Sequence, residues 1–377
     1  MTRRKRSREP GRTGWLSHQR YLWHDTGSAA GFLEAGGWLE PLAHVESAAT
    51  KRRFLNLVEV SGLLCELTEI RPRPASREQL LAVHTPDYVA RIEMLSAGRG
   101  GDAGDGTTAF GRGGFEIAQL AAGGAISAVE AVVRGEVDNV YALVRPPGHH
   151  ALPDRGMGFC IFNNIAIAIR HAQSALGVGR VAVVDWDVHH GNGTQAIFYE
   201  DRTVLTISVH QDRCFPVDSG WAGERGAGAG RGATLNIPLP PGSGHAAYVD
   251  AFSRVVVPAL ERFDPELLVV ASGLDANGFD PMGRMLLHSD SYRTLTEMML
   301  ELADGRLVAI HEGGYSEFYV PFCGMAILGA LSGSSIHIED PYLEDLKLGA
   351  GQELTGEQRR CIDEACELVG DVSATRV

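Results

Sequence analysis

Short apolar runs rich in valine, isoleucine and leucine recur along the chain from about residue 140 onward. Runs that are apolar at nearly every position are typical of strands buried on both faces. Segments with helical apolar spacing separate most of them, for example 161–175 and 246–263. This alternation predicts an α/β fold in which a parallel sheet lies between two layers of helices. The six predicted strands are 140–144, 181–184, 204–209, 234–239, 267–271 and 307–310.

The first third of the chain is predicted to be mostly helical. Ser47 and Ser76 stand where helix N-caps are expected, and Pro86 opens a further helical segment. The run at 115–133 predicts a long amphipathic helix whose small residues allow close packing. Between residues 97 and 114, a loop rich in glycine and aspartate is long enough to indicate a role in binding.

The chain is predicted to form one domain, because no repeat, low-complexity segment or linker divides it. We expect a basic, disordered segment at 1–15 and a single domain over 16–377 with a helical C-terminal tail at 356–369. No apolar stretch follows the basic residues 1–12, so neither a secretory nor a twin-arginine signal is predicted. A cytoplasmic location is therefore expected.

Composition narrows the class of protein. Hydrophobic residues make up 44% of the 377 residues and glycine contributes 46, which suits a globular enzyme core. The formal net charge of −13 argues against general nucleic-acid binding and is compatible with cationic substrates. Cysteines without a C-x-x-C pair indicate reduced thiols. No apolar run approaches the roughly 18 residues that a membrane span needs.

Polar clusters directly follow four of the predicted strands. They are 145–150 after the first strand, 185–194 after the second, 272–277 after the fifth and 311–315 after the sixth. In folds of this class, ligands bind outside the carboxyl ends of the strands. We therefore expect the four clusters to meet in one crevice.

The cluster after the second strand contains acids and imidazoles that are costly to bury without a counter-charge. Asp187 and His189 are two residues apart at a strand end, so their side chains project to the same side and can share one ion. Asp275 would complete three protein ligands with open positions, the arrangement of a catalytic zinc site. The alternative is that these acids are helix caps at strand-to-helix turns.

Two adjacent histidines, His149 and His150, follow a rigid Pro-Pro-Gly turn. An imidazole can act both as the base that accepts a proton from a metal-bound water and as the acid that protonates a departing amine. The alternative is that the histidine pair is only a surface feature of a loop. Asp185 is expected to orient one ring, and Asn192 the other without a negative charge. The two rings should then differ in pKa, with His149 the higher if Asp185 is its partner.

Three aromatic residues lie near these clusters. Tyr315 follows a flexible Gly313-Gly314 pair, which would let its phenol swing over the metal and donate to an oxyanion. The alternative is a tyrosine packed at a turn. Phe159 and Phe215 lie in loops bounded by glycine or proline, where they are either core residues or the walls of a narrow apolar tunnel.

Five motifs in this order resemble those of the zinc-dependent histone deacetylases. They are Arg-Pro-Pro-Gly-His-His, Gly-Phe-Cys-Ile-Phe-Asn-Asn, Asp-Trp-Asp-Val-His-His-Gly-Asn-Gly-Thr-Gln, Ser-Gly-Leu-Asp-Ala-Asn and Glu-Gly-Gly-Tyr. The likeness extends over roughly residues 20–335 and is strongest to the class II branch and its bacterial histone deacetylase-like amidohydrolases. It implies the arginase–deacetylase fold, a parallel eight-stranded sheet between helices with one zinc at the carboxyl edge of the sheet.

The resemblance also implies residue roles. By motif position, Asp187, His189 and Asp275 match the zinc ligands of the family. His149 and His150 match its tandem histidines, and Tyr315 matches its transition-state tyrosine. Phe159 and Phe215 match the walls of the substrate tunnel, and Gly158 and Gly314 are also implied to contact the substrate. An inner potassium site is implied at Asp185, Asp187, His189, Ser208 and Val209.

Three further positions bear on the number of metal ions and on the substrate: Gly191, Gly273 and Met282. Gly191 and Gly273 stand where the related arginases have the acids that bind a second metal, so a single metal is expected. Met282 stands at a tunnel-rim position where a glutamate would favour polyamines by pairing with their second cation. Methionine offers no such charge, which favours acyl-lysine or other amides. The donor set suits zinc and ferrous iron alike.

The expected reaction is removal of an acetyl or similar acyl group from a lysine side chain or related amine. A zinc-bound water attacks the amide, the histidine pair transfers protons, and Tyr315 polarises the carbonyl. Alternatives are an acetylpolyamine or other small-amide hydrolase, a non-catalytic acyl-lysine-binding or metal-binding module, and an arginase-like ureohydrolase with two metals per chain. No nucleic-acid or membrane partner is expected. The acyl preference and the oligomeric state, a homo-oligomer included, stay open.

Overall fold

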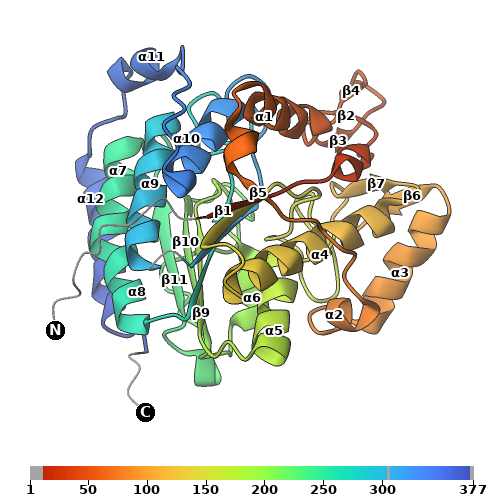
Figure 1. Cartoon of the computed structure of the whole chain (residues 1–377), viewed down its shortest axis with the longest axis horizontal. Coiled ribbons are helices and arrows are strands. Elements are labelled where there is room, and N and C mark those ends of the chain that lie inside the picture. The colour runs from red at the N-terminus through yellow and green to blue at the C-terminus, as the bar shows by residue number, and fades with distance from the viewer. Residues whose placement is uncertain (1–11, 304–305, 374–377) are drawn as a thin grey trace.

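A computed structural model describes residues 12–303 and 306–373 (Figure 1). Its centre is an eight-stranded sheet in the order β11-β10-β9-β12-β13-β8-β1-β5, and every neighbouring pair is parallel. The strands are β1 (Thr13–Leu16), β5 (Thr68–Glu69), β8 (Asn139–Ala142), β9 (Val181–Asp185), β10 (Val204–Gln211), β11 (Thr234–Leu239), β12 (Leu267–Ser272) and β13 (Leu307–His311). The predicted eight-stranded parallel sheet between helices is confirmed.

Helices cover both faces of the sheet because strand residues alternate between two apolar cores. Ala182 and Val184 of β9 point into one core, and Val181 and Val183 point into the other. The first core is covered by α1 (Ala48–Val60), α7 (His245–Ala251), α8 (Val257–Phe263), α9 (Ser289–Leu302), α10 (Val320–Ser332) and α12 (Gly356–Val369). The second core is covered by α2 (Arg77–Leu81), α3 (Pro86–Ala97), α4 (Gly114–Val133), α5 (Asn164–Leu176) and α6 (Asn192–Phe198). In Figure 1 these two sets lie on opposite sides of the sheet.

The folded domain begins earlier than the sequence predicts. The expected boundary between residues 15 and 16 falls inside β1 and is wrong, because Thr13 and Gly14 pair with β8 and Trp15 is buried. A strand of four residues, like the two-residue β5, is too short to show a periodic pattern. Residues 1–11 of the expected disordered segment lie outside the described residues.

The predicted helix signals agree with the structure. Ser47 caps α1, and Ser76 forms a capping box with Gln79 at the start of α2. The expected tail helix is α12, which contributes the buried side chains of Ile362 and Ala365 to the first core and therefore belongs to the domain. The predicted loop at 97–114 contains a short hairpin, β6 (Gly100–Asp102) and β7 (Ala109–Gly111).

One described helix, α4, is long and apolar enough to cross a membrane by length and composition. This differs from the expectation that no apolar run approaches that length. The most apolar stretch of α4 is 78% buried inside the domain, where it packs on α5 and β8. Packing within the second core accounts for its composition.

The order of the strands brings the four polar clusters together. The chain proceeds from β8 to β9, β10 and β11 at one edge, and then returns to place β12 between β9 and β13. Ligands bind where the strand order reverses in this way. The clusters follow β8, β9, β12 and β13, which are neighbours in the sheet, so the prediction that they meet is confirmed.

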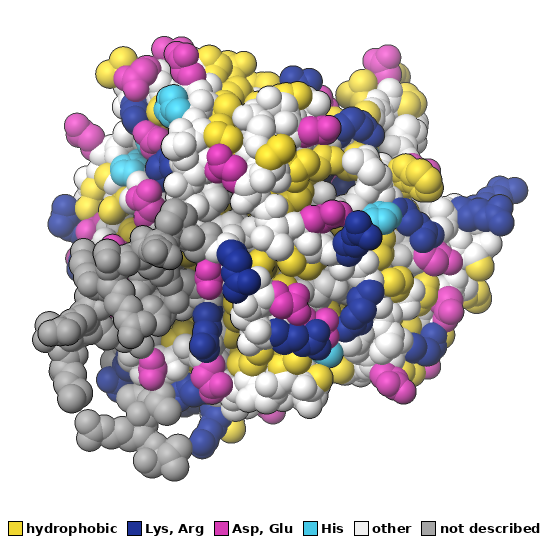
Figure 2. Space-filling view, viewed as in Figure 1, with side chains coloured by type: hydrophobic (Ala, Val, Ile, Leu, Met, Phe, Trp, Pro, Cys, Tyr) yellow, Lys and Arg dark blue, Asp and Glu magenta, His cyan; other side chains and the backbone are white. Residues whose placement is uncertain are grey.

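A small antiparallel sheet projects from the N-terminal part of the domain. It consists of β3 (Leu33–Glu34), β2 (Ser28–Ala30) and β4 (Leu42–Ala43), in that order. Figure 2 shows hydrophobic side chains around this projection. The large exposed hydrophobic residues of this region are Phe32, Leu33, Trp38, Leu39 and Leu42. Phe32 also reaches the cavity described below.

Candidate active site

Asp187, His189 and Asp275 form a compact, buried group at the ends of β9 and β12. One ligand atom from each lies within 4.8 Å of the others. Asp187 Oδ1 lies 3.0 Å from His189 Nδ1, and Asp275 Oδ2 lies 3.3 Å from the same nitrogen without a hydrogen-bond partner. Burial and then the charge of Asp187 raise the pKa of Asp275 to about 6. Two buried carboxylates, one of them with an unpaired oxygen, and an imidazole fit a divalent cation.

Two glycines keep the space between these carboxylates free. A Cβ atom at Gly273 would collide with the Asp187 carboxylate, and one at Gly313 would collide with the carboxylate of Asp275. The backbone also orients the ligands, because Gly313 N–H donates to Asp187 Oδ2 at 2.9 Å and Val188 N–H donates to Asp275 Oδ1 at 2.8 Å. A larger residue at either glycine would fill the space that an ion requires.

His149 and His150 lie beside this group, with ring centroids 3.9 Å apart. His149 Nδ1 lies 2.9 Å from Asp185 Oδ2, and His150 Nδ1 lies 2.7 Å from Asn192 Oδ1. The predicted pairing of each ring is therefore confirmed. Both rings are almost fully buried.

The pKa values of the two rings differ as predicted, with that of His149 the higher. Burial disfavours a charged ring at both positions. At His149 the charges of Asp187 and Asp185 outweigh burial and raise the pKa above its ordinary value. At His150, burial and the charge of His149 hold the pKa well below its ordinary value. The surroundings thus favour the charged form at His149 and the neutral form at His150.

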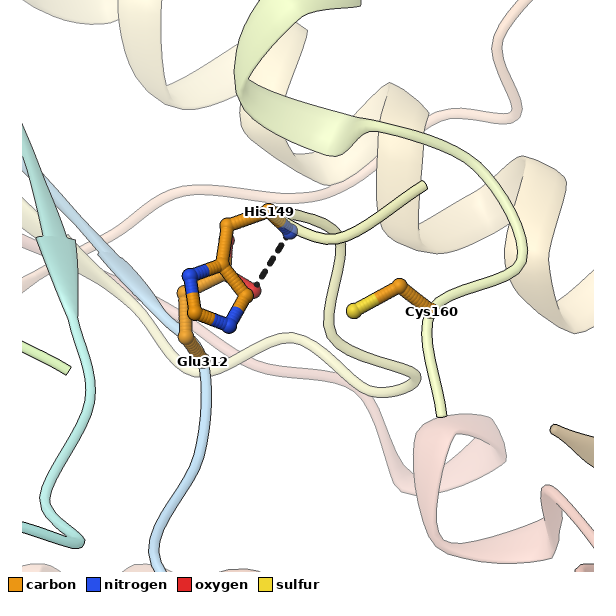
Figure 3. Close-up of side chains that lie close together, drawn as sticks. All are labelled: His149, Cys160 and Glu312. Carbon is orange, nitrogen blue, oxygen red and sulfur yellow. Dashed lines mark hydrogen bonds between the residues drawn. The ribbon is translucent and has the colours of Figure 1, made fainter. Parts of the chain in front are cut away.

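Glu312 anchors the backbone of the loop that carries His149 and His150. Its Oε2 accepts hydrogen bonds from Gly148 N–H at 2.6 Å and from His149 N–H at 3.1 Å. Figure 3 shows this carboxylate beside His149, with Cys160 close by. These three residues also lie close enough to hold a metal, and Glu312 Oε1 has no hydrogen-bond partner. However, His149 Nδ1 faces Asp185, Glu312 Oε2 accepts two backbone bonds, and burial raises the pKa of the Cys160 thiol well above its ordinary value. The group formed by Asp187, His189 and Asp275 is therefore the better candidate for the metal site.

A cavity of about 550 Å³ opens beside the metal group. His150, His189 and Tyr315 line it, together with all three predicted wall and rim residues and Gly158. Phe159 lies edge-on to Tyr315 with ring centroids 5.8 Å apart, and Phe215 lies edge-on to His150 at 4.9 Å. Gly314 is absent from the lining, but its φ of 134° shapes the turn that presents Tyr315.

The glycine- and aspartate-rich loop supports one wall of the cavity. Asp105 Oδ2 accepts a hydrogen bond from Gly158 N–H at 2.7 Å, and Thr108 Oγ1 accepts one from Phe159 N–H at 3.0 Å. Phe159 has a φ of 70°, a left-handed conformation that these bonds hold in place. The loop therefore supports the cavity wall through residues that the sequence did not single out, and the role in binding that its length indicated stays a prediction.

Asp280 links Tyr315 to the rim of the cavity. Its Oδ2 accepts hydrogen bonds from the backbone N–H groups of Tyr315 at 2.7 Å and Ser316 at 3.3 Å. Its Oδ1 accepts one from Met282 N–H at 2.9 Å. Asp280 precedes Met282 by two residues, and nothing in the local sequence pattern predicts its contact with a residue 35 positions away.

The residues of the implied potassium site are close together but divide into two environments. Asp185 pairs in register with Ser208, and both border a very small cavity of about 10 Å³. Ser208 Oγ lies 2.9 Å from His210 Nδ1. Asp187, His189 and Val209 do not border that cavity. A potassium ion at this place stays a prediction.

Comparison with known proteins gives a consistent result. The model of the histone deacetylase domain matches residues 44–331. The chain is 53% identical to a histone deacetylase-like amidohydrolase of Pseudomonas aeruginosa, over 89% of this chain and 90% of the relative. It is 41% identical to a probable deacetylase of Archaeoglobus fulgidus, with 89% and 91% coverage. It is 38% identical to the human polyamine deacetylase HDAC10, over 78% of this chain and 45% of that protein.

A solved structure shares the fold. The crystal structure of the HDA15 HD domain superimposes with a TM-score of 0.84 at 29% identity, covering 96% of this chain and 95% of that one.

Proposed function

Because this chain belongs to the histone deacetylase family and is a deacetylase-type amidohydrolase, we propose that it removes acetyl or related acyl groups from lysine side chains. The observation that carries this proposal is the arrangement at one end of a single cavity. There, a three-residue metal group, two unequal histidines and a tyrosine surround the place where an amide carbonyl would lie.

Asp187, His189 and Asp275 would hold the metal, for which zinc and ferrous iron are the candidates. When bound, the ion would polarise the amide carbonyl and make a water molecule more acidic. A single ion per chain is proposed, since Gly191 and Gly273 have no side chain with which to bind a second.

His150 is the proposed proton carrier. Its ring borders the cavity, is neutral, and uses Nδ1 toward Asn192, which leaves Nε2 to accept the proton of the attacking water. The same nitrogen then gives the proton to the departing amine. His149, kept charged by Asp185 and Asp187, stabilises the negative charge that builds up on the reacting centre.

Tyr315 is the proposed donor to the carbonyl oxygen. Burial, together with the charges of Asp275 and Asp187, raises the pKa of its phenol well above the ordinary value. The hydroxyl therefore stays protonated and can donate a hydrogen bond to the oxyanion. Phe159 and Phe215 form apolar sides of the cavity that suit the alkyl chain of an acyl-lysine.

The rim of the cavity favours acyl-lysine over acetylpolyamine. Among the described residues, three with charged side chains line the cavity, and Asp212 is the one acid of these three. Its Oδ2 lies 3.8 Å from Arg213 Nε. Arg284 adds a second cation, and Met282 is neutral. The overall charge of −13 would attract a polyamine. At physiological salt, however, exposed charges interact over roughly 8 Å, so the arginines at the rim should determine which substrate the cavity accepts. The second candidate, an acetylpolyamine hydrolase, is supported by the likeness to the human polyamine deacetylase.

A substrate panel with metal analysis tests the proposal. Purified protein with its metal content measured would be given an acetyl-lysine peptide, free acetyl-lysine, acetylspermidine and acetylputrescine. We expect one metal per chain and the highest kcat/KM with an acetyl-lysine substrate. Higher kcat/KM with the polyamines would make the second candidate correct. Hydrolysis of none of them by metal-loaded protein would overturn both.

A further inference from the structure

A buried lysine lies next to Tyr315. Lys51, in α1, is 2% exposed, and its Nζ lies 3.2 Å from Glu46 Oε1. The same ammonium lies 5.7 Å from the centroid of the Tyr315 ring. None of the sequence motifs includes Lys51, which stands in the segment Glu46-Ser-Ala-Ala-Thr-Lys51 nearly a hundred residues before the first active-site cluster.

The carboxylate that holds Lys51 already has another partner. Arg145 Nε lies 2.9 and 3.1 Å from the two oxygens of Glu46, and its terminal nitrogen lies 2.8 Å from Oε2. Glu46 and Arg145 are both fully buried. Two cations therefore share one anion, and the group of three carries one surplus positive charge.

A surplus charge of this kind is not explained by folding. Burying an ammonium costs several kcal/mol, which a single shared carboxylate repays only in part. Glu46 and Arg145 alone would form a neutral pair with two-point contact. Burial and, more weakly, Arg145 lower the pKa of Lys51, while Glu46 and, more weakly, Asp275 oppose that shift. An apolar residue in place of Lys51 would cost the fold less than the lysine does.

The surplus charge is placed where the reaction needs it. A cation near the face of a phenol ring attracts the π electrons, holds the ring in position and makes the O–H group a stronger donor. A fixed positive charge in a buried site also stabilises an oxyanion, because the low dielectric strengthens the interaction. Phe159 also contacts the Tyr315 ring edge-on, and Asp280 accepts a hydrogen bond from the Tyr315 backbone N–H.

We propose that Lys51 is a positioning residue for Tyr315, and that its buried ammonium holds the ring and strengthens the hydroxyl as a donor to the substrate carbonyl. The inference rests on the proposed deacylase function, in which Tyr315 makes that hydrogen bond. It predicts that the effect of Lys51 on turnover passes through the tyrosine hydroxyl.

A double-mutant cycle tests this prediction. The variants are Lys51→Met, Tyr315→Phe and the pair, assayed with an acetyl-lysine substrate at equal metal content. We expect Lys51→Met to lower kcat roughly 5- to 30-fold with little change in KM. In the Tyr315→Phe background the same substitution should change kcat less than about 2-fold, because the hydroxyl it acts on is gone. Lys347→Met, at a partly exposed lysine paired with Asp290, is the matched control and should leave kcat unchanged.

Two results would overturn the inference. One is a normal kcat in Lys51→Met. The other is an equal loss of kcat in both backgrounds, which a purely structural role would give. Should Lys51→Met not fold, Lys51→Gln keeps an N–H donor toward Glu46 and allows the same comparison. Inactive wild-type protein would instead contradict the proposed function, so the two failures are distinguishable.

Discussion

The floor and the rim of the cavity are built in different ways. The floor consists of Asp187, His189, Asp275, His149, His150 and Tyr315, all less than 9% exposed, on segments that follow four neighbouring strands. The rim consists of Phe32, Asp212, Arg213, Met282 and Arg284, which come from loops in three separate parts of the chain. The floor is buried and would carry the proposed reaction, whereas the rim is partly exposed and would contact the rest of the substrate. A floor substitution should lower turnover of every substrate, and a rim substitution should change the ratio between substrates.

The largest effect is expected for removal of a metal ligand. Asp275→Ala should bind less than one metal per chain and lower turnover of all substrates by roughly 10³-fold or more. Metal content by mass spectrometry and kcat/KM with two substrates are the measurements. Asp290→Ala, at a partly exposed acid paired with Lys347, is the control. Full metal content with normal turnover in Asp275→Ala would assign the metal elsewhere.

Tyr315→Phe should have the next largest effect. Loss of one donor to an oxyanion lowers kcat about 10²- to 10³-fold. Because Tyr315 is not in the metal group, the metal content should stay that of the wild type. The same factor is expected for lysine and polyamine substrates, since the hydroxyl acts on the shared carbonyl. Near-normal turnover would remove this residue from the mechanism.

A smaller effect is expected when the two histidines are made alike. Asp185→Asn gives His149 an amide partner such as His150 already has, without changing the size of the side chain. We expect kcat to fall roughly 10- to 100-fold, because one of the two charges that raise the pKa of His149 is lost. Asn192→Asp is the complementary variant and should raise the proton affinity of His150. Unchanged turnover in both variants would show that the inequality of the rings is not used.

The rim variant should have the smallest effect. Met282→Glu introduces an acid at the cavity edge, and the ratio of kcat/KM for acetylspermidine over an acetyl-lysine peptide should rise about 2- to 5-fold, the scale of a partly exposed ion pair. The increase should diminish at high salt. Met282→Gln controls for the change of shape. Equal ratios in the two variants would place the choice between substrates elsewhere.

The floor was predictable from sequence and the rim mostly was not. Buried strands make continuous apolar runs, and polar residues at their ends stand out, so Asp187, His149 and Tyr315 could be placed in advance. Asp105 and Asp280 could not, because each acts on backbone N–H groups 35 or more residues away. The terminal strands β1 and β5 were missed because two to four residues show no period.

The charged residues of the rim likewise could not be predicted from local sequence. Arg284 reaches the rim because its backbone N–H donates to Gln211 Oε1 at 2.7 Å. That contact between two loops leaves no local signal in either. Met282 was placed at the rim only through family resemblance, and the structure does place it there.

The Asp280 carboxylate has a consequence for how this scaffold can change over time. It holds Met282 by the backbone N–H, so the side chain at position 282 is free to vary while the backbone stays fixed. The other oxygen of the carboxylate keeps Tyr315 in place whatever residue stands at 282. With the proposed role of position 282 in substrate choice, single substitutions there should change substrate preference while Tyr315 stays in place. Libraries that randomise position 282 and keep Asp280 should be rich in active variants, which makes this loop a starting point for directed evolution toward other amides.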